Sequence, residues 1–163
     1  MAREAEVLAA FGRLPSATQI LKAVGLSVDY ARVPTHTLEH ARRRGKAVHA
    51  AIQYAHEGTL DESTIHPEVA PGYSAYQKFL VDSRFTYQAG EFEVLHPTWL
   101  YLGHPDLCGT LDGRRVLIDI KYMDTVHLRA ASYQLTLYRL AWEAQHPDQP
   151  ITACYVLQLK HDG

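Results

Sequence analysis

Cysteine is scarce in this chain, which has only Cys108 and Cys154 among its 163 residues. Two cysteines are too few for a disulfide framework or a four-cysteine metal cluster, so reduced structural cysteines are expected. Long apolar runs are missing too, and none approaches the roughly 20 residues that span a bilayer. Residues 1–16 contain acids and no apolar signal core. The sequence therefore predicts a cytoplasmic protein without a membrane partner.

A large excess of one charge is also missing, since the formal net charge is −2 at pH 7. The surface as a whole thus gives no indication of a nucleic-acid partner. Cations nevertheless concentrate in one place, where Arg42, Arg43, Arg44 and Lys46 fall within six residues. A run of this kind on a helix is usually a solvated face, and contact with a phosphate backbone is the alternative interpretation.

The pattern of apolar residues indicates a single domain spanning residues 1–163. The hydrophobic fraction of 47% and the charged fraction of 21% are ordinary for a globular domain of this length. Helical spacing and β-rich stretches predict an α/β fold with a central mixed sheet, an antiparallel meander and flanking helices. The helices are expected from Ser16 to Gly25 and over 36–58, 72–83 and 127–145, and the strands over 85–97, 99–111, 114–123 and 151–160.

Two aspartates face each other in the predicted hairpin. The dipeptide Asp112-Gly113 favours a two-residue type I′ turn, because both central positions of that turn need positive φ. Pairing residues outward from the turn brings Asp106 opposite Asp119, at a non-hydrogen-bonded site where Cα atoms are only ~4.5 Å apart. Carboxylates that close repel each other and destabilise a sheet. A bulge would shift this register by one residue.

Paired carboxylates can share a proton or a divalent cation. Lys121 lies two residues beyond Asp119, so both side chains project from the same face of the strand. A neighbouring ammonium keeps both carboxylates ionised, which suits a hard, oxygen-seeking ion such as Mg²⁺ or Mn²⁺. The alternative is a surface salt bridge among Asp106, Asp119 and Lys121.

Three weaker features accompany this hairpin. His49 lies on the apolar helix 36–58, where a lone histidine is more often a core residue than a ligand. Glu91 and Glu93 share a face of the preceding predicted strand and are ordinarily solvated. Gln134 and Tyr138 are spaced i, i+4 on the predicted crossover helix, either as an amphipathic boundary or as a pair that reaches the sheet.

Together these residues resemble the PD-(D/E)XK nuclease superfamily, in its RecB-like branch of phage and bacterial exonucleases. The matching pieces occur in the family's order and cover nearly the whole chain. They are "LPSATQIL", "RGKAVH" ending at His49, "GHPD" ending at Asp106, "DIK" ending at Lys121, and "QLTLY" from Gln134 to Tyr138. The resemblance implies a restriction-endonuclease-like core. The family sheet usually continues beyond the last predicted strand, so a C-terminal extension is expected to be absent or supplied by a partner.

The resemblance also implies a set of metal ligands. Asp106 and Asp119 would be the main ligands of Mg²⁺ or Mn²⁺, and the backbone carbonyl of Ile120 would complete the set. His49 would match the histidine that adds a ligand in this branch. Some relatives carry a four-cysteine iron–sulfur cluster, which two cysteines cannot build.

Further roles follow from the same resemblance. Glu93 is the preferred residue for the additional acidic ligand, with Glu91 as its competitor. Lys121 would orient or activate the attacking water and stabilise charge on the phosphate. Gln134 and Tyr138 would match the branch's "QxxxY" motif, which supports the site and the DNA backbone.

The implied function is a metal-dependent deoxyribonuclease, expected to act as an exonuclease in DNA recombination, repair or replication, with proteins of those processes as further partners. The sequence does not give the polarity, the strand preference, the choice between exo- and endonuclease action or the oligomeric state. The rival interpretation is a catalytically silent module of the same fold that binds DNA or a protein. A zinc site built from His36 and His40 is disfavoured, because no cysteine or carboxylate set accompanies them.

Overall fold

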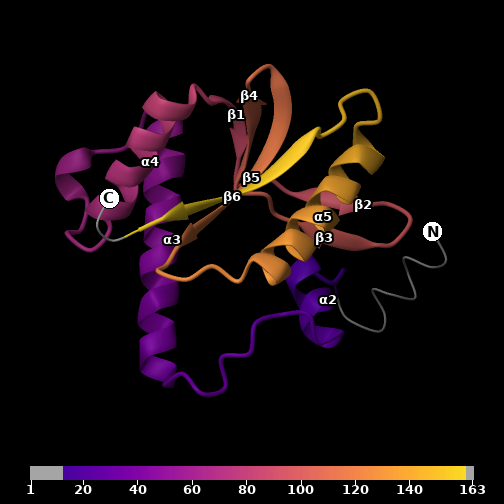
Figure 1. The fold of residues 1–163 in the computed structure, drawn as a ribbon, viewed down its shortest axis with the longest axis horizontal. Coiled ribbons are helices and arrows are strands. Elements are labelled where there is room, and N and C mark those ends of the chain that lie inside the picture. The colour runs from indigo at the N-terminus through magenta and orange to yellow at the C-terminus, as the bar shows by residue number, and fades with distance from the viewer. Residues whose placement is uncertain (1–12, 161–163) are drawn as a thin grey trace.

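A mixed four-stranded sheet forms the centre of the structure, a computed structural model that describes residues 13–160 (Figure 1). The strand order is β1-β4-β5-β6. The pairs β1–β4 and β4–β5 are antiparallel, and β6 runs parallel to β5. The expected mixed sheet with its antiparallel part is therefore confirmed. The strands span Thr86–Gly90 (β1), Leu107–Leu111 (β4), Arg114–Tyr122 (β5) and Ala153–Leu159 (β6).

Helices cover both faces of this sheet (Figure 1). On one face, α3 and α4 enclose a core with Val48, Tyr76 and Ile118 at its centre. On the other face, α5 and α2 enclose a second core around Leu117 and Trp142. The helices span Ala17–Ala23 (α2), Thr35–Glu57 (α3), Ala70–Ser83 (α4) and Leu128–Gln145 (α5), with a short 3₁₀ turn at Glu62–Thr64 (η1).

Local sequence sets the limits of these helices. Ser16 caps α2 through a capping box, in which its side chain accepts from the backbone N–H of Gln19 and the Gln19 side-chain oxygen accepts from the backbone N–H of Ser16. α3 ends at Gly58, whose φ of 70° lies in the left-handed region that glycine adopts without strain. Both helices thus match their predicted extents closely.

The predicted strands 85–97 and 99–111 are wrong as single strands. Each is broken in two, because a short β2 (Val94–His96) and β3 (Tyr101–Gly103) leave the main sheet and form a two-stranded sheet of their own. A bulge between Tyr87 and Ala89 and the left-handed backbone of Glu91, with φ of 48°, turn the chain out of the main sheet. Pro105, which has no N–H to donate, separates β3 from β4.

The hairpin register is the one that the Asp-Gly turn predicts. Asp112 and Gly113 have φ of 49° and 74°, and the β4–β5 ladder runs from Leu111↔Arg114 to Leu107↔Ile118. The ladder stops there, so Asp106 precedes β4 and does not form the expected ladder pair with Asp119. Its Oδ2 instead accepts a hydrogen bond of 2.6 Å from the backbone N–H of Ile120.

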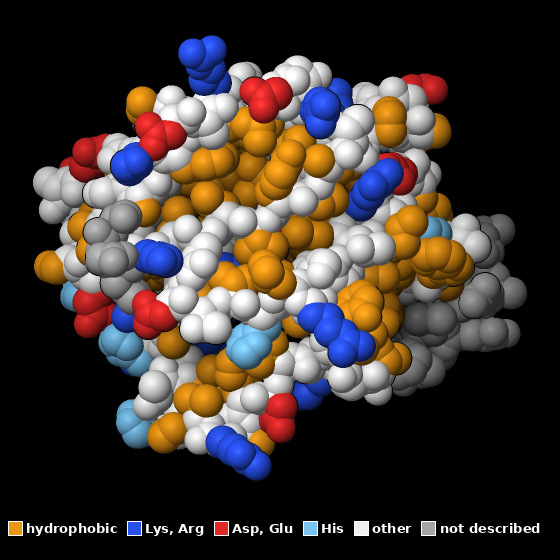
Figure 2. Space-filling model, in the orientation of Figure 1, with side chains coloured by type: hydrophobic (Ala, Val, Ile, Leu, Met, Phe, Trp, Pro, Cys, Tyr) orange, Lys and Arg blue, Asp and Glu red, His pale blue; other side chains and the backbone are white. Residues whose placement is uncertain are grey.

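The edge strand β6 borders a hollow on its α5 side. Figure 2 shows apolar side chains gathered there, and the lining includes Leu135, Leu140 and Val156. Within residues 13–160, no helix has both the length and the apolar character needed to cross a membrane. Most of the N-terminal segment behind the cytoplasmic expectation, and the last residues of the chain, lie outside the described range.

Candidate metal centre

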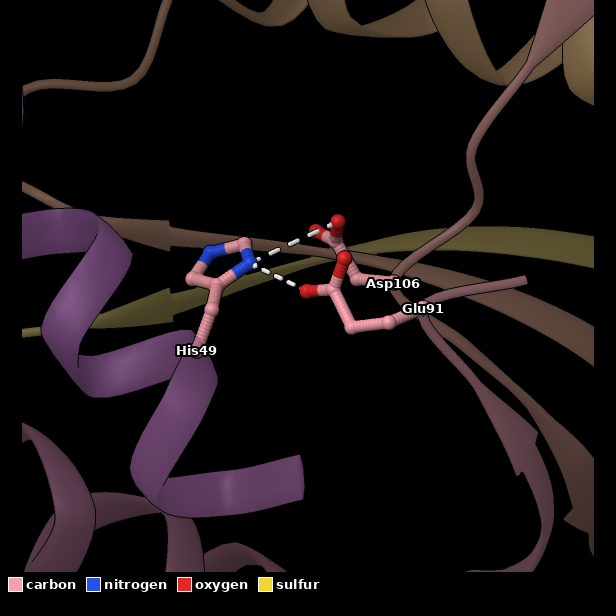
Figure 3. A group of neighbouring side chains, drawn as sticks. All are labelled: His49, Glu91 and Asp106. Carbon is pink, nitrogen blue, oxygen red and sulfur yellow. Dashed lines mark hydrogen bonds and ion pairs between the residues drawn. The ribbon is translucent and has the colours of Figure 1, made fainter. Parts of the chain in front are cut away.

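His49, Glu91 and Asp106 converge from three separate segments (Figure 3). His49 projects from α3, Glu91 follows β1, and Asp106 immediately precedes β4. The Nδ1 atom of His49 lies 3.0 Å from Oε1 of Glu91 and 3.5 Å from Oδ1 of Asp106. One nitrogen or oxygen atom from each residue lies within 4.8 Å of the others. Among the described residues, this is the group of three whose donor atoms are arranged to hold a metal ion.

The imidazole of His49 also approaches the sheet backbone. Its Nε2 lies 3.3 Å from the carbonyl oxygen of Ile120 on β5. Burial by itself would lower the pKa of His49, but the hydrogen bond to Glu91 and the charge of Asp106 outweigh it, and the pKa is raised. The ring therefore stands between carboxylates on one side and a carbonyl oxygen on the other, in strongly anionic surroundings.

Asp106 is the most perturbed carboxyl group of the centre. Its pKa is raised to about 7, because burial and the charge of Asp119 outweigh the lowering effects of His49, of the Ile120 N–H and of Lys121. The side chain is 11% exposed. The raised pKa means that the surrounding protein groups do not fully stabilise the ionised form of this carboxyl. A nearby cation would favour that form.

Asp119 is the second buried carboxylate, with 1% of its surface exposed. Within residues 13–160 neither of its oxygens accepts a hydrogen bond, and the ammonium of Lys121 forms an ion pair with it at 2.7 Å from Oδ2. Alternation along β5 places these two side chains on the α5 side of the sheet, opposite the face that α3 covers. His49 thus reaches the end of the sheet from one layer, and Asp119 and Lys121 reach it from the other.

The structure brings Glu91, and not Glu93, to this centre. Gly90 allows the end of β1 to approach Asp106, since a Cβ there would lie 2.9 Å from the Asp106 carbonyl oxygen. The N–H of Glu91 then donates to that same oxygen at 3.0 Å. Glu93 lies with His104 instead, its Oε2 3.3 Å from Nε2. The two glutamates were expected on one face of a strand, but the chain leaves the strand at Glu91 and separates them.

Gln134 and Tyr138 form a pair on α5 next to the centre. The amide nitrogen of Gln134 donates to the hydroxyl of Tyr138 at 2.6 Å. Burial raises the pKa of Tyr138 to about 12, so the phenol stays protonated at neutral pH. The ring packs on Gly103, where a Cβ would lie only 2.6 Å from Cδ1. Since Gly103 opens the "GHPD" segment, this contact helps to fix the backbone that carries Asp106.

The basic run on α3 divides into different environments. Arg42, Arg43 and Lys46 are exposed. Arg44 is half-buried, and its guanidinium lies over the ring of Tyr122, 5.1 Å from the ring centroid. Arg44 therefore packs against the fold, whereas the other three cations are accessible to an anionic partner.

The donor set fits a hard divalent cation. The group offers the carboxylates of Glu91 and Asp106 and one imidazole nitrogen, with the carbonyl of Ile120 beside His49, and oxygen donors of this kind suit Mg²⁺ or Mn²⁺. Asp119 lies outside this group of three and is paired with Lys121. Oδ1 of the nearby Asp119 has no hydrogen-bond partner in the described part of the chain, and such a buried polar atom is costly, which favours a cation close by.

The histidines of the disfavoured zinc site are engaged elsewhere. Nε2 of His40 lies 3.2 Å from Oε2 of Glu68, which precedes α4, and Nε2 of His36 lies 3.2 Å from Oγ1 of Thr37.

No protein-family model and no curated protein sequence matches this chain.

Proposed function

We propose that this protein is a metal-dependent deoxyribonuclease with a restriction-endonuclease-like core. The observation that carries the proposal is the buried Asp119, whose Oδ1 has no hydrogen-bond partner within the described residues and whose Oδ2 is paired with Lys121, close to Asp106, a second carboxyl that is only 11% exposed. Burying two neighbouring carboxylates without enough compensation is destabilising. Binding of one or two divalent cations would compensate the negative charge of these carboxylates.

Phosphodiester hydrolysis needs a water nucleophile and compensation for the charge that develops on the phosphate. When bound, Mg²⁺ or Mn²⁺ lowers the pKa of a water and stabilises that charge. This explains why a site for an anionic substrate is itself lined by acids, since the cation reverses the sign of the local field. Glu91, Asp106, Asp119 and the Ile120 carbonyl would hold it, with His49 as a further ligand.

Lys121 is the residue that we assign to the reaction itself. Its Nζ stands 2.7 Å from Asp119 and it is 24% exposed, so the ammonium is held at the centre and still faces solvent. A cation in this position can orient a water molecule and stabilise the negative charge of the attacked phosphate. Gln134 and Tyr138 act as positioning residues through the packing of Tyr138 on Gly103.

The biological setting follows from the resemblance to RecB-like exonucleases. We propose DNA as the substrate, and action on DNA ends during recombination, repair or replication in a bacterium or phage-infected cell. The exposed cations Arg42, Arg43 and Lys46 supply affinity for the phosphate backbone in a protein whose net charge is slightly negative.

Digestion of end-labelled single-stranded, duplex and circular DNA over a series of divalent metals tests this function. We expect cleavage with Mg²⁺ or Mn²⁺, none in EDTA, and loss of cleavage in Lys121→Ala. Lys78→Ala is the matched control, because Lys78 also lies 2.7 Å from an aspartate but is exposed on α4. If the wild-type protein degrades no DNA with any metal, the nuclease function is refuted and a silent binding module remains. If Lys121→Ala cuts as fast as wild type, the role of Lys121 is wrong.

A further inference from the structure

A cavity of about 730 Å³ opens beside the candidate metal centre. Its volume falls in the range of roughly 300–1,000 Å³ that is usual for small-molecule sites. The wall is built from α2, the segment that joins α2 to α3, the first part of α3 and the start of α5. It shares Lys121 and Gln134 with the centre, and its other lining residues include Leu21, Val28, Tyr30, Leu38, Arg42 and Val126.

The cavity has an apolar wall and a cationic border. Leu21 is buried, and Val28 and Leu38 are half-buried at its surface. The charged lining residues are Lys22, Arg42 and Lys121 against the single carboxylate of Asp29. This combination suits a ligand with an apolar, flat body and negative charge attached to it.

An aromatic side chain completes the wall. Tyr30 is half-buried, and its ring stands edge-on to the ring of His127, with centroids 6.4 Å apart and an interplanar angle of 84°. Both residues line the cavity. Aromatic rings that line an apolar recess can stack with a nucleobase, and base–aromatic stacking tolerates any sequence.

We propose that this cavity seats one unpaired base of a DNA strand whose backbone passes Lys121 at the metal centre. This inference rests on the proposed nuclease function and deepens it by naming the form of the substrate. A base inside a duplex is paired and stacked, and it enters a recess only after both interactions are broken. This base-binding cavity, called the seat below, therefore selects single-stranded or frayed DNA. Arg42 and Lys22 contact the phosphates that flank the bound base.

The shared residues provide the link between seat and centre. Lys121 forms the ion pair with Asp119 and also lines the cavity. Gln134 donates to Tyr138 and lines the cavity as well. The cavity and the centre therefore meet at Lys121 and Gln134.

Fluorescence polarisation in EDTA tests the seat without any cleavage. The probes are a fluorescein-labelled oligodeoxythymidylate of about 12 nucleotides, a blunt duplex of equal length and the matching RNA strand. Ala130→Phe fills the cavity from α5, and Ala144→Phe places the same side chain at an exposed position of that helix. Arg42→Glu reverses a charge at the border, and Arg114→Glu does so at the exposed turn of the hairpin.

We expect the wild-type protein to bind the single strand about tenfold more tightly than the duplex, and Ala130→Phe and Arg42→Glu each to weaken that binding about tenfold. The two control variants should bind within about twofold of wild type. Circular dichroism melting checks that Ala130→Phe folds, and Arg42→Glu tests the seat through an exposed side chain.

Unchanged binding by Ala130→Phe and Arg42→Glu, a preference for the duplex, or tighter binding of the RNA strand would each overturn the seat. The two proposals fail in distinguishable ways. If cleavage depends on Lys121 but the cavity variants bind DNA as wild type does, the nuclease function is supported and the base-binding seat is refuted. If these variants bind DNA more weakly and the wild-type protein cuts no DNA, the seat is supported and the nuclease function is refuted.

Discussion

The substitution Asp119→Asn separates a metal site from a structural ion pair. Asparagine keeps the shape of the side chain and removes its charge at a position that is 1% exposed. If Asp119 served only Lys121, divalent cations would affect both proteins equally. If the centre binds a cation, the wild-type fold gains stability from Mn²⁺ and the variant loses most of that gain.

The size of the effect follows from linkage between binding and folding. A cation present at 100 times its dissociation constant adds about 2.7 kcal/mol to the free energy of unfolding, provided that it binds only the folded state. For a domain of this length, each kcal/mol raises the melting temperature by about 2–4 °C, so the expected rise is about 5–11 °C. Mutation of residues that hydrogen-bond to metal ligands lowers the affinity for the metal about 10–100-fold, and the loss of a ligand itself should lower that affinity at least as much.

Thermal melting followed by circular dichroism, with and without a Mn²⁺ titration and with EDTA as the reference, measures this difference. Asp112→Asn is the matched control, because Asp112 is exposed at the turn of the same hairpin, where asparagine accepts the left-handed backbone. Its cation-dependent rise should equal that of wild type. Absence of a rise in the wild-type protein would refute the metal centre, and an equal rise in Asp119→Asn would show that Asp119 is not one of its ligands.

Three further outcomes are expected. Glu91→Gln should slow cleavage about 10–100-fold and Glu93→Gln should not, and the reverse order in a cleavage assay would show that the wrong glutamate stands at the centre. Gly103→Ala should lower the melting temperature by about 2–12 °C and reduce cleavage, because its Cβ would lie 2.6 Å from the buried ring of Tyr138; an unchanged melting temperature contradicts this packing. Burial lowers the pKa of His56 below the 6.5 of the unfolded chain. As the pH falls, the unfolded state therefore takes up the proton first, and the stability contributed by neutral His56 is lost below about pH 6.5. Urea unfolding at pH 5 to 8 should therefore show the advantage of wild type over His56→Gln shrinking toward pH 5, and a gap that is constant or widens at low pH would refute it.

Short-range chemistry explains what was predictable in the fold. The Asp-Gly dipeptide selects its turn from backbone preferences alone, and the ladder from Leu111 to Leu107 follows from that turn. The cap at Ser16 and the stop at Gly58 are equally local, as is the spacing that puts Asp119 and Lys121 on one face of a strand. Each depends on residues within a few positions of one another.

The break in the two predicted strands was not predictable from alternation. The residues around 85–97 and 99–111 are rich in strand formers on both sides of each break, and β2 and β3 are indeed strands, but of a different sheet. Pro105 was a local signal of a break. Which sheet a segment joins depends on partners far away in the chain, because pairing and burial set strand stability more than intrinsic preference does. The bulge after Tyr87 and the turn at Glu91 are visible only in that context.

By itself the sequence determined which chemistry-bearing residues are present and how those within one element are spaced: two aspartates and a lysine on a hairpin, a histidine on a helix, and a Gln–Tyr pair on another. Only the tertiary structure decided which of them meet. It brought His49 to the sheet from the opposite layer to Asp119, chose Glu91 over Glu93, and opened a cavity beside Lys121 from four segments. These contacts join residues tens of positions apart, and their geometry is set by the packing of two helical layers on one sheet, which no local pattern encodes.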